Sequence, residues 1–248
     1  MGKTFEALER AKQESGENIP CVSKRPPDRE VGASASLVSN SMAIERCREL
    51  KANLLTSHPD KTIKSILFVG TSPGDGSSTM AVNYATLLSK DSERMVLLMD
   101  LNGGDFNPHE SSKTDRPQAL TDDDIGEEQG AFQIKKMGPE NLSLLIFDRK
   151  SIKYTEFFEP DRIDRFLKMA YKRFDCLIIA APSASGASKA LAFYAKVDGI
   201  VMVILSGKTR RQIAIKAKEA IGDAGGKLLG VVLNRRKYYI PESIYRRL

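Results

Sequence analysis

The sequence predicts a doubly wound α/β domain with a mostly parallel sheet and an N-terminal helical arm. Three observations lead to this fold class. From residue 65 onward, short apolar runs alternate with longer stretches of helical pattern. The apolar runs contain no polar alternation, which is typical of strands covered on both faces. The first run leads into a glycine-bearing turn, and a helical pattern follows it.

Three regions are expected along the chain. Residues 1–13 are predicted to form an amphipathic helix, because Phe5 and Leu8 recur at helical spacing. Residues 14–40 are rich in Gly, Pro and Ser and are predicted to be a linker. Residues 41–248 are predicted to form the α/β domain.

Within this domain, strands are expected at 66–69, 96–99, 142–147, 176–179, 200–205 and 228–233, and helices at 43–55, 81–89, 163–173, 188–196 and 210–222. The polar stretch 110–130 is expected to be a loop. Apolar residues recur every fourth position over 240–248, which favours a terminal helix over a phosphorylated tail.

Composition limits the function classes. The three cysteines match no metal or disulfide spacing, and the opening residues are too polar for a secretory signal, so a cytoplasmic protein with reduced thiols is expected. No apolar run is long enough to cross a bilayer. The formal net charge of +6 comes with dispersed basic residues and no nucleic-acid-binding motif, so a nucleic acid is not an expected partner.

The turn after the first predicted strand has the character of a phosphate-binding loop. Its segment Pro73-Gly74-Asp75-Gly76-Ser77-Ser78-Thr79 opens a helix, where glycines and backbone N–H groups can face an anion. In an active loop of this kind, Lys follows the last glycine and Ser or Thr then binds magnesium. Here Ser77 stands in the lysine position, and Ser78 remains as the predicted magnesium ligand.

Two further strand ends belong to the same pattern. The run 96–99 ends at Asp100, as expected of a Walker A′ acid in deviant-Walker ATPases. The run 176–179 has the pattern of a Walker B strand, but Ala180 stands where an acid would organise magnesium.

With these motifs, the chain resembles the bacterial tyrosine kinases (BY-kinases), the cytoplasmic autokinases of capsule and exopolysaccharide assembly. The resemblance covers nearly the whole chain, including the opening residues 2–11, the loop at 73–79 and the tail at 238–242. It implies ATP or ADP with magnesium as the ligand, and it gives Asn234 a contact with adenine. It also implies an oligomerisation helix formed by Glu45, Arg48, Lys51 and Asn53. For the first three of these, an intrahelical surface ladder is an equally weighted alternative.

The departures from the family pattern concern catalysis. The Asp-x-Asp-x-Arg pattern after the Walker A′ strand becomes Asp100-Leu101-Asn102-Gly103-Gly104, so the second acid and the arginine are missing. Together with Ser77 and Ala180, this predicts a pseudoenzyme with weak nucleotide binding and no catalytic residue. Its expected role is to regulate polysaccharide assembly or export by binding a membrane chain-length or export protein, a kinase relative or its own copies, with recruitment to the inner face of the cell membrane.

Two alternatives stay open. The first is a residual ATPase or tyrosine kinase that uses the loop backbone, Ser78 and Asp100, with Asp100 as the catalytic residue. The second is a ParA-like positioning protein, which the linker and the predicted oligomerisation helix disfavour.

Overall fold

The computed structural model describes residues 41–57, 59, 62–91, 94–101, 132–137, 141–147, 152–184 and 188–235. The predicted N-terminal helix at 1–13, the linker at 14–40, the loop at 110–130 and the terminal helix at 240–248 lie outside the described residues. None of the described helices is both long and apolar enough to span a membrane.

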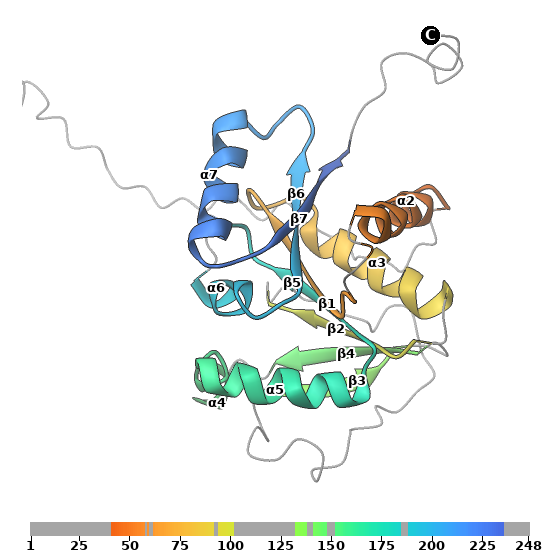
Figure 1. Cartoon of the computed structure of the whole chain (residues 1–248), viewed down its shortest axis with the longest axis vertical. Helices are drawn as coiled ribbons and strands as arrows, with labels where there is room; N and C mark the ends of the chain where they lie inside the picture. The colour runs from red at the N-terminus through yellow and green to blue at the C-terminus, as the bar shows by residue number, and fades with distance from the viewer. Residues whose placement is uncertain are drawn as a thin grey trace, which may run out of the picture. The chain divides into compact units, whose positions relative to one another are not determined.

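The described strands form one seven-stranded sheet in the order β3-β4-β2-β5-β1-β6-β7 (Figure 1). Their bounds are β1 (Ser65–Gly70), β2 (Val96–Asp100), β3 (Phe132–Lys136), β4 (Leu142–Phe147), β5 (Cys176–Ala181), β6 (Gly199–Leu205) and β7 (Leu228–Asn234). All neighbouring pairs are parallel except β3 and β4, which are antiparallel. The predicted mostly parallel α/β sheet is therefore confirmed.

Helices cover both faces of this sheet. Their bounds are α2 (Ser41–Ser57), α3 (Ser77–Asp91), α4 (Ile152–Glu156), α5 (Pro160–Arg173), α6 (Ser188–Tyr194) and α7 (Arg211–Asp223). Buried residues of α2 and α3 pack in one apolar cluster with one face of the strands, and those of α5, α6 and α7 pack in a second cluster with the other face. Two-sided coverage explains why β1 and β5 are buried at every position, as their uninterrupted apolar sequences predict.

The structure departs from the sequence prediction in three elements. Strand β3 was not predicted, because it is a short edge strand on which buried Phe132 and Ile134 alternate with more exposed residues. The five-residue helix α4 was also missed. Helix α3 begins at Ser77, four residues before the predicted start at 81, so the polar segment 77–80 belongs to the helix and not to the turn.

Candidate functional site

The phosphate loop lies at the carboxyl end of β1, between Gly70 and the start of α3 at Ser77. A tight turn forms its centre: the Asp75 N–H donates to the Ser72 carbonyl oxygen at 3.2 Å, and Gly74 has φ +85°. Proline followed by a glycine with positive φ is the signature of a type II turn. The Pro73-Gly74 pair therefore sets the shape of the loop.

The Asp75 carboxylate ties this loop together from inside. The residue is only 3 % exposed, and its Oδ2 accepts the backbone N–H groups of Thr71 at 2.9 Å and Ser72 at 2.8 Å. It also accepts a short hydrogen bond from the Thr71 hydroxyl. A buried carboxylate needs such donors, because its water has been removed. Sequence reasoning placed Asp75 among the nucleotide-binding residues and missed this role, although an Asp four residues after a Thr across a Pro-Gly turn is a recognisable signal.

Asn234, at the end of β7, packs against the same loop. Its Nδ2 donates to the Asp75 carbonyl oxygen at 2.8 Å, and its Oδ1 accepts the Arg235 N–H at 2.8 Å. Gly76 has φ +90°, and a Cβ there would lie 2.2 Å from the Asn234 Nδ2. The fold thus brings Asn234 to the loop. Its contact with adenine stays a prediction, and in this structure both ends of its amide already bond to the chain.

The first turn of α3 is the part of the loop where an anion is predicted to bind. The first backbone bond along this helix runs from the Met80 N–H to the Gly76 carbonyl oxygen at 3.0 Å. The amides of Ser77, Ser78 and Thr79 therefore precede the helical ladder, in the position where helix N-termini bind phosphate. The backbone of the loop fits an anion. The half-buried Ser78 remains the predicted magnesium ligand.

Ser77, in the position of the lysine, makes a contact with a neighbouring strand. The Ser77 hydroxyl donates to the Ala181 carbonyl oxygen of β5 at 3.4 Å. Ser77 thus contacts the neighbouring strand, and its short side chain brings no positive charge to the loop.

Ala180 and Asp100 are register partners on the adjacent strands β5 and β2. Ala180 is 1 % exposed and lies in the apolar cluster that also contains its β1 register partner, Phe68. Asp100 is half-buried at the end of β2. The two strand ends therefore lie side by side, and the end of β5 carries the methyl group of Ala180 where an acid is expected. Asn102, Gly103 and Gly104 lie outside the described residues, and the described part of the chain holds no cluster of three His, Cys, Asp or Glu side chains that could bind a metal.

The charged residues of α2 form contacts within the chain. Arg48 lies 3.3 Å from Glu45 on the same helix and 3.8 Å from Asp91 at the end of α3. Lys51 lies 3.4 Å from the second oxygen of Asp91, and Asn53 is exposed. Of the surface ladder considered for this helix, the Glu45–Arg48 pair is present, whereas Lys51 pairs with Asp91 of α3. The Arg48 side chain remains 54 % exposed, so the oligomer contact stays a prediction.

Comparison with known proteins extends the resemblance seen in the sequence. No protein-family model matches the chain. It is 26 % identical to the tyrosine-protein kinase YwqD of Bacillus subtilis (strain 168) over 79 % of this chain and 83 % of that protein. It is 24 % identical to the putative tyrosine-protein kinase CapB of Staphylococcus aureus over 81 % of this chain and 88 % of that protein.

Solved structures show the same fold. The chimerical protein CapA2B2 matches with a TM-score of 0.61 at 22 % identity, over 78 % of this chain and 85 % of that one. The kinase domain of the Escherichia coli tyrosine kinase ETK matches with a TM-score of 0.60 at 17 % identity, over 79 % and 78 %. A variant of McdA from Cyanothece in complex with ATP matches with a TM-score of 0.54 at 21 % identity, over 72 % and 73 %. The chain is therefore similar in sequence to proteins named tyrosine-protein kinases, and it shares its α/β fold with the kinase domain of ETK.

Proposed function

We propose that this chain is a non-catalytic homologue of the tyrosine kinases of exopolysaccharide and capsule assembly. It regulates assembly or export by binding a membrane chain-length or export protein, or a kinase relative, which recruits it to the inner face of the cell membrane. One observation carries the proposal: where a phosphate-binding lysine and a strand-end acid would stand, Ser77 contacts the carbonyl oxygen of Ala181 and Ala180 is buried among apolar side chains.

The rate of phosphoryl transfer depends on how well negative charge is stabilised in the transition state. Phosphoryl transfer relies on positioned cations and magnesium to stabilise negative charge that spreads over the transferred group. Removing one stabilising donor costs about 10²–10³-fold in rate in well-studied enzymes. Here the lysine and the Walker B acid are absent together, and Gly104 stands where the resemblance implies an arginine. Several such losses in one site leave little catalysis.

Nucleotide binding without turnover is a second candidate, and the loop backbone supports it. The turn at Pro73-Gly74, the close packing at Gly76 and the helix start at Ser77 form a cradle of backbone amides. Such a cradle fits the phosphates of ATP or ADP, with Ser78 and Asp100 as the residues that would approach magnesium. The loop has Ser77 in place of the lysine that would compensate the charge of the triphosphate, so weak affinity is expected.

Substitution of Asp100 in living cells separates regulation from residual catalysis. We expect cells that carry Asp100→Ala in this chain to make the same amount and length of polysaccharide as wild type, because a role based on association needs no acid at the site. Deletion of the whole chain is the matched control and should change the product. Loss of output in the Asp100→Ala strain, with normal protein level, would support the residual kinase instead.

A further inference from the structure

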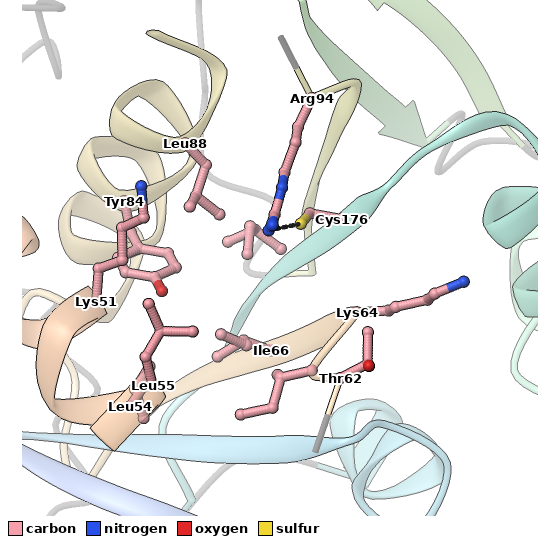
Figure 2. Close-up of a pocket in the computed structure, with 12 residues that line it drawn as sticks. Lys51, Leu54, Leu55, Thr62, Lys64, Ile66, Tyr84, Leu88, Arg94 and Cys176 are labelled. Carbon is pink, nitrogen blue, oxygen red and sulfur yellow. Dashed lines mark hydrogen bonds between the residues drawn. The ribbon is translucent and has the colours of Figure 1, made fainter. Parts of the chain in front are cut away.

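A cavity of about 300 Å³ lies at the opposite edge of the sheet from the phosphate loop (Figure 2). It is lined by residues of α2, α3 and the amino ends of β1 and β5, and by Arg94 just before β2. Its volume is at the lower end of the range for small-molecule sites. The nucleotide site does not use this space, whereas Lys51 belongs both to its lining and to the predicted association surface of α2.

The wall of the cavity is mostly apolar. Among its lining residues, Leu54, Ile66, Leu88 and Ile178 are each at most 5 % exposed, whereas Leu55 at the mouth is 63 % exposed. These side chains come from both helices and both strands, so the wall is held by the core cluster of this face. A hydrocarbon group of matching size would be stabilised there by removal from water.

One buried polar group points into this apolar space. Tyr84 is 4 % exposed, and Figure 2 shows its hydroxyl directed toward the leucine side chains of α2. No described residue provides a hydrogen-bond partner for this hydroxyl. Burial, followed by the nearby thiols of Cys176 and Cys47, raises the pKa of Tyr84, so the group stays a neutral donor. The hydroxyl oxygen is not among the fully buried polar atoms, so it is accessible from the cavity and can donate to a bound acceptor.

The lining also contains three basic residues, Arg94, Lys51 and Lys64. The Arg94 guanidinium contacts the Cys176 Sγ at 3.9 Å, and no carboxylate of the described residues forms an ion pair with it. Burial raises the pKa of the Cys176 thiol, so the thiol does not neutralise Arg94. Lys51 shares Asp91 with Arg48. Lys64 also lines the cavity, but Figure 2 shows its ammonium group directed away from it.

We propose that this cavity binds a small anionic amphiphile, a free carboxylic acid with a hydrocarbon part of roughly eight carbons. Arg94 pairs with the carboxylate and Lys51 adds to the positive field, since guanidinium and carboxylate groups form strong charge-assisted hydrogen bonds. The Tyr84 hydroxyl is the buried donor available to the ligand, and the apolar wall takes the hydrocarbon. Because the cavity borders α2 and α3, an occupant would also stabilise the contact between these helices.

Calorimetric titration of the purified full chain with sodium octanoate tests this site. We expect saturable binding of one octanoate per chain, and at least tenfold weaker binding of octan-1-ol, which lacks the charge. Arg94→Ala should weaken octanoate binding at least tenfold. Lys64→Ala, which removes an equal charge from the same lining, should leave it unchanged.

Tyr84→Phe gives a readout that a purely structural role would not produce. It should weaken octanoate binding several-fold while the thermal midpoint of the free protein stays constant or rises, because the hydroxyl has no bond to lose. If Tyr84→Phe lowers that midpoint, the octanoate affinity of the Arg94→Ala variant tests the site instead, because the Arg94 residue is exposed.

Equal binding by wild type and Arg94→Ala, or no saturation, would overturn the proposal. The proposal would also be overturned if the chain did not bind octanoate but bound vesicles of phosphatidylglycerol and phosphatidylcholine in a way that depends on Arg94. The site would then be one for membrane lipid.

Discussion

In the position where a phosphate-binding lysine is expected, Ser77 forms a neutral hydrogen bond with the end of β5. The Ser77 hydroxyl donates to the carbonyl oxygen of Ala181, next to the buried methyl group of Ala180. Asp75 satisfies its charge inside the loop, through the amides of Thr71 and Ser72. At the scale of single residues, the loop keeps its shape without a positively charged side chain in the lysine position.

Restoring the lysine should repair binding without restoring chemistry. We expect Ser77→Lys to raise the affinity for ATP with magnesium by about tenfold or more, since a hydrogen bond to a charged group contributes about 1.5–3 kcal/mol. Turnover should stay at background, because Ala180 still supplies no acid. Calorimetric titration measures the affinity, and phosphate release measures the turnover.

The control for this substitution is Asn141→Lys, at an exposed residue just before β4 and beside the amino end of β2, which adds the same charge away from the loop. Its ATP affinity should match wild type. Ordinary kinase activity in Ser77→Lys alone would show that another acid serves in place of Ala180.

The predictability of single residues depended on whether their partners are local. The loop glycines and Ser77 follow from the chain order, because a strand, a turn and a helix start are consecutive. The bond from Asn234 to the Asp75 carbonyl oxygen joins positions 159 residues apart, so no local pattern contains it. The predicted contact of Asn234 with adenine came from the family resemblance, and the cavity around Tyr84 and Arg94 was not predicted.

At the scale of elements, α2 carries the prediction about association. If Arg48 and Lys51 contact a neighbouring subunit or a kinase relative, Arg48→Glu/Lys51→Glu should abolish that complex, because both charges are reversed. Light scattering gives the mass in solution, and capture of the partner gives the heterologous contact. An unchanged mass together with unchanged capture would favour the surface ladder alone.

The intramolecular bridge to Asp91 requires a matched control. The double reversal places two acids beside Asp91 and would weaken the packing of α2 on α3. Adding Asp91→Lys restores attraction between the two helices while the outer surface stays reversed. This triple variant should fold like wild type by thermal unfolding and still fail to associate.

Element prediction succeeded where burial is simple. Strands β1 and β5 are covered on both faces, and their continuous apolar runs were found to within two residues at each end. Strand β3 pairs only with β4, at the edge of the sheet, and alternates in burial over five residues, so its signal is short and weak. Helix α4 is a single short turn segment, too brief for a period to appear.

At the scale of the whole molecule, the two edges of one sheet have different chemistry. The carboxyl edge holds the phosphate loop at the start of α3, where ligands of open α/β sheets bind. The amino edge holds the cavity under α2 and α3. The fold was predictable because buried strands, helices and the glycine-bearing turn leave local patterns in the sequence, whereas the proposed loss of activity depends on single side chains at two strand ends and one turn.

The most direct test of the central claim is the fate of the γ-phosphate of labelled ATP. The purified full chain is incubated with magnesium and labelled ATP, and phosphate release and phosphotyrosine are measured together for wild type and Asp100→Ala. We expect both proteins to give the same background values, because neither has the charges to stabilise the transferred group. Clear phosphotyrosine in wild type that Asp100→Ala abolishes would contradict it.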